Sequence, residues 1–172
     1  MLPLVTLVLV AIPMLLETRR SRANEHSLRA AGAIEPPDDV YTAMRVAYPT
    51  IFVAMIAEGV LHDVAWSGQA AVGLSIFAIA KALKYAAIAT LGPRWTFRVL
   101  VPPGSVRTLH GPYRWLRHPN YVGVMGEIIG VAVMMGAAVA GLVSSLLFLM
   151  ILRRRIAVEE RALGDGVTRV RG

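Results

Sequence analysis

The chain contains no cysteine and has little charge for its length. The absence of cysteine from all 172 residues excludes disulfide bonds, thiol chemistry and cysteine-ligated metal sites. The four histidines do not cluster, and there is no glycine-rich phosphate loop or His-Glu-x-x-His pair, so we expect no metal site. Only 17% of the residues are charged and 56% are hydrophobic, which leaves too little charge for the surface of a soluble domain. We therefore expect an integral membrane protein.

Apolar segments of the required length are present. About 20 residues of helix cross the hydrocarbon core of a bilayer. We predict membrane segments at Leu2–Leu16, Val46–Leu61, Gln69–Leu91 and Tyr121–Leu152. The last segment is too long for one span and short for two, and Gly136 and Gly141 interrupt it, which favours a hairpin of two short helices. The sequence thus predicts an all-α fold of about five transmembrane helices, the last two forming the hairpin.

The basic residues are unevenly distributed, and their positions predict the topology. The net charge is +7, and Lys and Arg concentrate in segments 17–45, 92–120 and 153–172. Under the positive-inside rule these segments are cytoplasmic, with the N-terminus outside and the C-terminus inside. Contacts with membrane lipids explain this charge more simply than nucleic acid, which we do not expect as a partner. The first apolar segment lacks the basic start and cleavage site of a signal peptide, so we expect it to be retained.

Ionisable residues interrupt the second and third apolar segments. Glu58, Lys81 and Lys84 lie within them, and charged groups inside a bilayer usually face the bundle interior or a wet cavity. Lys81 and Lys84 share a helical face, and we expect Lys84 to extend its ammonium group toward the cytoplasmic end. Lys81 lies deeper and needs a partner, for which Glu58 is the candidate. A structural ion pair and a contact with a substrate both remain open for these residues.

Segment 92–120 is the longest basic stretch without an acidic residue, and its prolines and glycines predict a loop with short turns. Loops of this length are usually functional. Pro119 suits the first position of a helix, whose free N–H groups beside Arg117 can bind an anion. Glu159 and Glu160, at the far end of the hairpin, can receive an ammonium group or a ribose hydroxyl. The two ends suit a small zwitterion, although a solvated rim that only sets topology explains them equally well.

Two motifs carry a family resemblance. The segment Gly111-Pro-Tyr-Arg-Trp-Leu-Arg-His-Pro-Asn-Tyr-Val-Gly123, followed by the hairpin and by Arg155-Ile-Ala-Val-Glu-Glu-Arg-Ala-Leu163, resembles the isoprenylcysteine carboxyl methyltransferase family. Leu83-Lys84 and Leu91-Gly92-Pro-Arg-Trp-Thr96 resemble that family's third helix and the turn after it. The resemblance extends over residues 80–163, about half of the chain.

The resemblance implies a membrane methyltransferase that holds S-adenosylmethionine at the cytoplasmic face, in a bacterial inner membrane. By motif position, the residues implied in cofactor binding are Arg117, His118, Pro119, Tyr121, Gly123, Glu159 and Glu160. A lipophilic acceptor would enter from the bilayer, and we assign its contacts to Glu58, Lys81, Lys84 and Trp95. The whole chain is then one domain, which divides into three helices (1–91), the cofactor-binding loop, hairpin and Glu-Glu segment (92–163), and a tail (164–172). The oligomeric state is not indicated.

Glu127, in the fourth predicted helix, is the candidate for acceptor chemistry. Methyl transfer from a sulfonium needs in-line positioning, and it needs a base only when the acceptor is a phenol or an enol. We assign a catalytic role to Glu127, as base or acceptor-binding group, together with Arg114. The alternative is that Glu127 is an interior carboxylate paired with Lys81, Lys84 or Arg114.

The acceptor itself is suggested by a narrower resemblance. The loop with Asn24-Glu25 and Glu35-Pro-Pro-Asp-Asp-Val-Tyr41, together with Glu58 and Glu127, resembles short bacterial members of the family associated with methylating alkylpyrones or alkylresorcinols. An oxygen of such a lipid, or the carboxylate of a prenylated thiol acid, is therefore the expected methyl acceptor.

Two other functions are compatible with parts of the sequence. Membrane sterol and enone reductases, which use NADPH, share a His-Pro-Asn-Tyr motif near a C-terminal hairpin, but they usually end in a Lys-Tyr-Gly…Trp tail that this chain lacks. A non-catalytic scaffold fits Gly126 and Gly130, whose spacing allows close helix packing. The scaffold leaves the 92–120 segment without a role.

Overall fold

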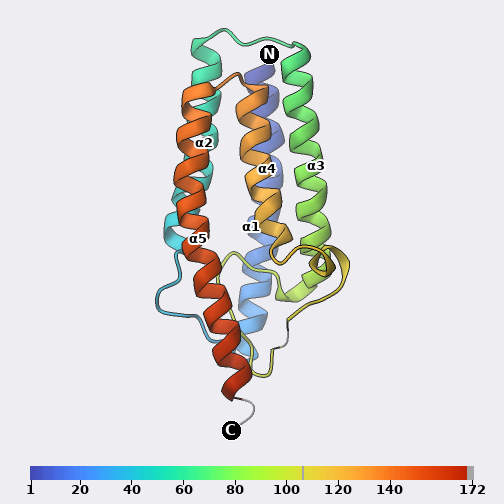
Figure 1. The fold of residues 1–172 in the computed structure, drawn as a ribbon, viewed down its shortest axis with the longest axis vertical. Helices are drawn as coiled ribbons and strands as arrows, with labels where there is room; N and C mark the ends of the chain where they lie inside the picture. Colours follow the sequence, from blue (N-terminus) through green and yellow to red (C-terminus); the bar gives the residue numbers. More distant parts are fainter. Residues whose placement is uncertain (106, 170–172) are drawn as a thin grey trace.

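The computed structural model of the protein describes residues 1–105 and 107–169, and the side chains of 1–105 and 107–164. Within these residues the fold is an all-helical bundle of five α-helices, with two short 3-10 turns, η1 (Gly92–Arg94) and η2 (Gly111–Arg114). The helices are α1 (Leu2–Ala30), α2 (Tyr41–Leu61), α3 (Gly68–Leu91), α4 (Pro119–Met134) and α5 (Ala138–Arg169). The helices stand side by side, and the N-terminus lies at the opposite end of the bundle from the end of α5 (Figure 1).

Three helices are long and apolar enough to cross a membrane. They are Leu2–Ala30, Tyr41–Leu61 and Gly68–Arg94, and α4 is a shorter apolar helix. The first half of α5 is also apolar, but three consecutive arginines follow Leu152. The protein is therefore an integral membrane protein, while the five predicted crossings and their orientation remain a prediction. We call the end of the bundle that carries the α3–α4 connection the loop end.

The first helix is longer than predicted. The predicted membrane segment stops at Leu16, but the helix continues to Ala30, so much of the predicted cytoplasmic segment 17–45 is helical and the connection between α1 and α2 is short. The reason is that the buried face of α1 continues at helical spacing, with Val10, Glu17 and Ser21 all buried. Asn24 anchors the extension, because its side-chain amide donates hydrogen bonds to the carbonyl oxygens of Gly92 and Trp95.

Helices α3 and α4 pack almost backbone to backbone. A Cβ atom built at Gly130 would lie 2.6 Å from the backbone nitrogen of Phe77, and one at Gly126 would lie 2.7 Å from the Cβ of Ala80. Glycine is required at both positions because any side chain would push the helices apart. The predicted close packing at this glycine pair is confirmed, and it operates within the chain. It places α4 directly against Lys84 of α3, whose Cβ would lie 2.9 Å from a Cβ at Gly123.

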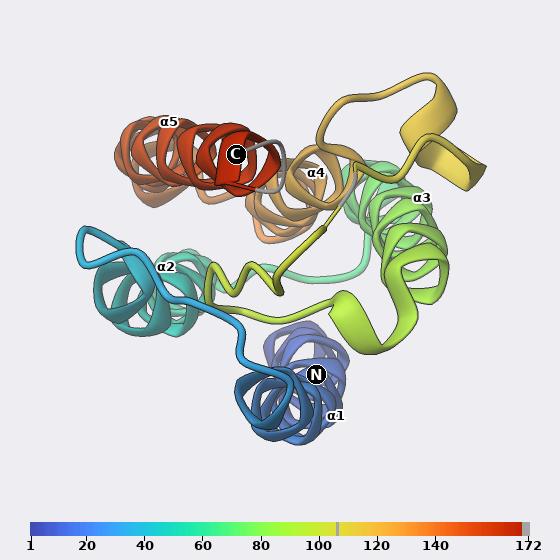
Figure 2. The ribbon, with the colours of Figure 1, turned by 90° about the horizontal axis from the view of Figure 1, so that it is seen from below.

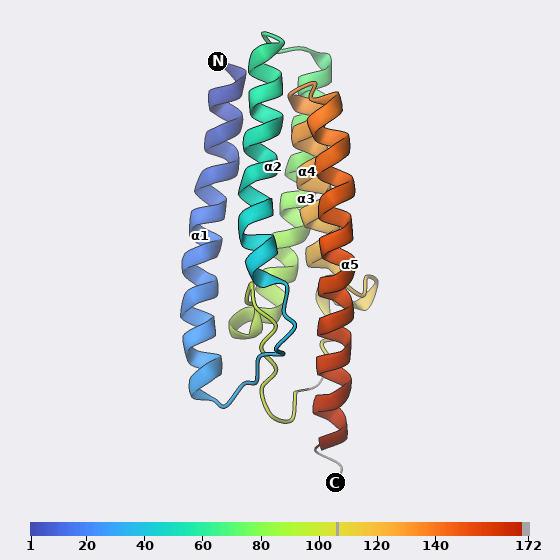
Figure 3. The same cartoon turned by 90° about the vertical axis from the view of Figure 1, so that its left-hand side faces the viewer.

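The hairpin between α4 and α5 turns at Gly136, which has a positive φ of 60°. The predicted second interruption at Gly141 is wrong, because Gly141 lies inside α5, where it packs against Ala132 of α4. Nor is α5 short, since it continues to Arg169. This length carries α5 past the start of α4 (Figure 3). Arg155, Glu159 and Glu160 thereby reach the start of α4, where they contact Tyr121 and His118.

The α1–α2 and α3–α4 connections are joined to each other at the loop end. Ile34, in the α1–α2 connection, pairs with Val101 through backbone hydrogen bonds of 3.0 Å in each direction. Asp39, in the same connection, accepts a hydrogen bond of 2.8 Å from the backbone N–H of Val99. Seen from below, the 92–105 segment runs across the space between the helices (Figure 2). The two connections therefore cover this end of the bundle.

Candidate active site

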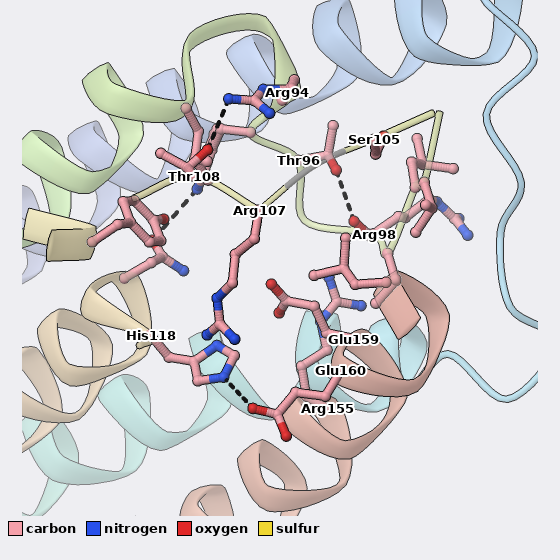
Figure 4. Close-up of a pocket in the computed structure, with 18 of the residues that line it drawn as sticks. Arg94, Thr96, Arg98, Ser105, Arg107, Thr108, His118, Arg155, Glu159 and Glu160 are labelled. Atoms are coloured by element: carbon pink, nitrogen blue, oxygen red, sulfur yellow. Dashed lines mark hydrogen bonds and ion pairs between the residues drawn. The ribbon is translucent and has the colours of Figure 1, made fainter. Parts of the chain in front are cut away.

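Two cavities adjoin at the loop end of the bundle. The first lies between the 92–120 segment, the start of α4 and the last turns of α5 (Figure 4). The second lies deeper, between α1, α2, α4 and α5. The residues that line both cavities are Trp95, Thr96, Asn120, Tyr121 and Arg155. These five residues form a shared wall, so a ligand in each cavity would lie close to the other.

On one side of the first cavity, a hydrogen bond and an ion pair connect the residues before α4 to α5. Nε2 of His118 lies 3.0 Å from Oε1 of Glu160 (Figure 4). Nε of Arg117 lies 2.7 Å from the same oxygen. The hydrogen bond from His118, aided by the charge of Arg117, holds the pKa of the Glu160 carboxyl below its usual value. The two halves of the sequence motif therefore meet, as predicted.

Tyr121 continues this connection deeper in the site. Its hydroxyl donates a 2.5 Å hydrogen bond to Glu159 and accepts one of 3.2 Å from Nε of Arg155. Arg155 is buried and also forms an ion pair with Asp39 in the α1–α2 connection. The Tyr121 ring stacks on His118, with ring centroids 5.5 Å apart. These contacts tie α4, α5 and the α1–α2 connection together around the shared wall.

The 92–120 segment supplies the opposite side of the first cavity. Arg94 donates a 2.8 Å hydrogen bond to the hydroxyl of Thr108, and the side chain of Arg107 extends over the cavity toward His118 (Figure 4). Tyr113 also lines this cavity. Its burial, together with the charge of Glu159, raises the pKa of its hydroxyl, so Tyr113 stays a neutral donor.

A buried charge cluster lies beside the second cavity. Nζ of Lys84 is 2.7 Å from Glu17 and 3.4 Å from Glu127, and Nζ of Lys81 is 3.3 Å from Glu17 and 3.0 Å from Glu127. The hydroxyl of Tyr48 donates a short hydrogen bond to Oε2 of Glu127. Two ammonium groups and two carboxylates balance formally, which makes their burial tolerable. We call these five residues the charge cluster.

The charge cluster corrects two of the sequence predictions and agrees with a third. Glu58 does not pair with Lys81, because it lies at the other end of the bundle, where it accepts hydrogen bonds from the backbone N–H groups of Val139 and Ala140. Lys84 does not extend to the cytoplasmic end, because Glu17 and Glu127 hold it at 2% exposure. The predicted alternative of a paired, interior Glu127 is confirmed.

The second cavity has an apolar wall with cationic groups. Its apolar lining includes Met14, Met44, Phe97, Val124 and Phe148. Its charged lining consists of Arg22, Arg45, Lys84 and Arg155, and among the described residues no aspartate or glutamate lines it. From the charge cluster only Lys84 and Tyr48 reach this cavity. The cavity therefore suits an apolar molecule that carries an acidic oxygen.

The other predicted site residues fall into three groups. Trp95 is buried in the shared wall, with its Nε1 3.4 Å from the side-chain oxygen of Asn120. Pro119 and Gly123 line neither cavity, and instead start α4 and bring it against α3. Arg114 is exposed, with its guanidinium group 5.8 Å from the ring centroid of Trp115, and lines neither cavity.

Sequence reasoning missed four residues of this region: Glu17, Asp39, Tyr48 and Arg155 in its interior role. Glu17 lies just beyond the predicted membrane segment Leu2–Leu16. The helical spacing of Thr6, Val10, Glu17 and Ser21 is the signal that could have shown a continuing helix face. No local pattern marks Tyr48, whose partners come from α3 and α4.

The chain is similar in sequence to several known proteins. It is 33% identical to the uncharacterized protein YpbQ of Bacillus subtilis over 84% of this chain and 86% of that one. It is 28% identical to an uncharacterized protein of Haemophilus influenzae over 81% of this chain and 82% of that one. It is 32% identical to protein-S-isoprenylcysteine O-methyltransferase of Mus musculus, over 60% of this chain and 36% of the mouse protein.

No solved structure gives a significant match. The family model for isoprenylcysteine carboxyl methyltransferase (ICMT) matches residues 71–165, from α3 to the glutamate pair and just beyond, which is more than half of the chain. The predicted resemblance is thereby confirmed, and the chain belongs to the isoprenylcysteine carboxyl methyltransferase family.

Proposed function

We propose that the protein is an S-adenosylmethionine-dependent O-methyltransferase of the membrane, with the cofactor in the first cavity and a lipophilic acceptor in the second. The observation that carries this proposal is the shared wall of five residues between a polar cavity and an apolar one. An enzyme that transfers a methyl group from a water-soluble cofactor to a lipid must bring the two together while the cofactor stays accessible to water and the lipid stays in the membrane. The adjoining cavities provide this arrangement, since one is reached from the loops and the other lies between the helices.

The side chains of the first cavity fit the proposed cofactor. S-adenosylmethionine supplies an electrophilic methyl group on a sulfonium, and it also carries an ammonium group, a carboxylate, ribose hydroxyls and an adenine ring. Glu159 and Glu160 can accept from the ammonium group and the hydroxyls, while Arg117 and Arg107 can bind the carboxylate. The apolar lining around Leu100 and Val101 can cover the adenine.

The second cavity supports a lipophilic acceptor with an acidic oxygen. Its apolar walls can bury an alkyl tail, and its cations can hold a phenolate, enolate or carboxylate. Alkylpyrones, alkylresorcinols and prenylated thiol acids all have this form. Because methyl transfer depends chiefly on in-line positioning, the protein's main task is to orient the acceptor oxygen toward the shared wall.

The distribution of charge supports a cytoplasmic site in a bacterial inner membrane. The loop end holds both cavities and the basic segments 92–120 and 153–164, whereas the α2–α3 connection at the other end carries no Lys or Arg. S-adenosylmethionine would then reach the first cavity directly from the cytoplasm.

Ligand binding to the full chain in detergent tests this proposal. S-adenosylhomocysteine should raise the melting temperature, because a ligand that binds only the folded state stabilises it, and NADPH should not. Glu160→Gln should weaken S-adenosylhomocysteine binding about tenfold, since it removes a charge-assisted contact of about 1.5 kcal/mol. Arg153→Gln, an exposed change on the same helix, is the control. Stabilisation by NADPH alone would indicate a reductase instead, and stabilisation by neither ligand would contradict the methyltransferase.

A further inference from the structure

Glu127 has the chemistry of a base but no direct access to an acceptor. It is 1% exposed and does not line the second cavity. Nζ of Lys81 and Nζ of Lys84 lie within 3.0 Å and 3.4 Å of its Oε1, and Tyr48 occupies its Oε2. A group that exchanges a proton with Glu127 must therefore do so through one of these neighbours.

Two neighbours of Glu127, Lys84 and Tyr48, also line the second cavity, but an ammonium group has no lone pair, so the group that can accept a proton is Tyr48. It lines the second cavity, and its hydroxyl already donates to Glu127. Because its proton is committed to Glu127, its oxygen acts as an acceptor: it accepts a hydrogen bond from Lys84, and its second lone pair can accept from a donor in the cavity. Nζ of Lys84 lies 3.4 Å from this oxygen and also lines the cavity.

Packing holds the Tyr48 ring in this position. Its centroid is 4.9 Å from that of Phe52 and 5.6 Å from that of Phe148, and the Lys84 ammonium group lies 5.2 Å from it. A Tyr48→Phe change would keep these ring contacts and remove only the hydroxyl. The Tyr48→Phe variant therefore tests the role of the hydroxyl without disturbing the packing of the ring.

We infer that Tyr48 is a catalytic residue that passes the proton of a phenolic acceptor to Glu127, and that the site methylates neutral phenols of lipids. This inference rests on the proposed function and adds the acceptor class and the route of its proton. Glu127 acts through Tyr48, and Lys84 stabilises the negative charge that develops on the acceptor oxygen.

The step balances in atoms and charge. The acceptor O–H gives its proton to the oxygen of Tyr48, whose own proton passes to Oε2 of Glu127. The acceptor oxygen forms the new O–C bond to the methyl group while the sulfonium S–C bond breaks, and that electron pair stays on sulfur. The sulfonium loses its positive charge, and Glu127 loses its negative charge by gaining one proton. This proton must leave Glu127 before the next turnover.

We call this transfer of the proton from the acceptor through Tyr48 to Glu127 the relay. The relay predicts that its loss affects the methylation rates of two acceptors with the same tail differently. The hydroxyl of an alkylresorcinol is a phenol, which is neutral near pH 7. The ring hydroxyl of an alkylpyrone is a vinylogous carboxylic acid, which is already ionised at neutral pH and needs no base. Removing the relay should therefore slow methylation of the alkylresorcinol and leave that of the alkylpyrone almost unchanged.

The experiment measures kcat and KM at pH 7 for full-length protein in detergent with S-adenosylmethionine and each acceptor, both with a pentadecyl tail. Tyr48→Phe should lower kcat for the alkylresorcinol about 100-fold, within the usual range for general base catalysis, with KM changed by less than about threefold. Glu127→Gln should lower the same kcat. Tyr85→Phe, the same chemical change on α3 outside both cavities, is the matched control.

The outcomes separate this inference from the proposed function. Loss of alkylresorcinol turnover alone supports the relay. Equal losses with both acceptors show that Tyr48 only shapes the cavity, and equal rates for Tyr48→Phe and wild type show that it has no role; either result overturns the relay. A wild-type protein that binds S-adenosylhomocysteine but does not methylate the alkylresorcinol also overturns it. Absence of S-adenosylhomocysteine binding by the wild type would instead contradict the proposed function.

Discussion

Tyr121 of α4 donates a 2.5 Å hydrogen bond to Glu159 of α5, and this bond joins the two halves of the sequence motif in the wall between the cavities. The same hydroxyl accepts from buried Arg155, whose other contact is Asp39. The residues between Tyr121 and Glu159 form the hairpin, so its length brings distant polar groups to one level of the bundle. The wall is thus built by the 92–120 segment, α4 and α5, and Asp39 of the α1–α2 connection holds Arg155 in it.

Tyr121→Phe tests the role of this wall in cofactor binding. The change removes the hydroxyl, leaves Glu159 and Arg155 without that partner, and keeps the ring stacked on His118. We expect about a tenfold loss of S-adenosylhomocysteine affinity by calorimetry, because a hydrogen bond to a charged group contributes about 1.5 kcal/mol. Tyr85→Phe should bind like the wild type. Unchanged affinity in Tyr121→Phe would show that the cofactor does not depend on this bond.

Asp39→Ala should destabilise the protein. The change leaves the buried guanidinium group of Arg155 without its carboxylate, and it removes the acceptor for the backbone N–H of Val99. Breaking a buried ion pair costs about 3–5 kcal/mol, so a large fall in melting temperature is expected. Asp38→Ala is the control, because Asp38 forms an exposed pair with Arg161, which contributes about 0–1 kcal/mol. Equal effects of the two changes would contradict this account.

The sequence predicted the polar site better than it predicted the charge cluster. The start of α4 at Pro119, the turn at Gly136 and the meeting of His118 with Glu160 all follow from local patterns that the structure confirms. Local patterns are sufficient there because proline and glycine fix the backbone where they occur. The length of the hairpin then determines which ends meet.

The predicted pairing of Lys81 with Glu58 is wrong because the two residues lie at different heights in the bundle. Glu58 lies three residues from the end of α2, whereas Lys81 lies thirteen residues into the next helix, so the two differ in height by about 15 Å at 1.5 Å per residue. Glu17 lies fifteen residues into α1, which starts at the same end as α3, and so matches the height of Lys81. The match is visible only once α1 is known to continue past Leu16.

Gly130→Ala should destabilise the contact between α3 and α4. The new methyl group would lie 2.6 Å from the backbone of Phe77, and backbone cannot move aside as a flexible side chain can. Overpacking of this kind costs about 1–3 kcal/mol, which thermal denaturation in detergent would detect. Gly68→Ala is the matched control, since no atom lies within 4 Å of a Cβ there and alanine favours the helix. A wild-type melting temperature in Gly130→Ala would show that the helices separate easily.

Glu58→Ala distinguishes a structural carboxylate from the acceptor contact predicted from the sequence. Glu58 accepts hydrogen bonds from the N–H groups of Val139 (3.0 Å) and Ala140 (2.5 Å), which the first turn of α5 leaves without partners. The variant should therefore have a lower melting temperature, because a helix that loses its cap is less stable. Its S-adenosylhomocysteine affinity and its KM for an alkylresorcinol should equal those of the wild type, because Glu58 lies at the end of the bundle away from both cavities. A raised KM with an unchanged melting temperature would restore Glu58 to the acceptor site.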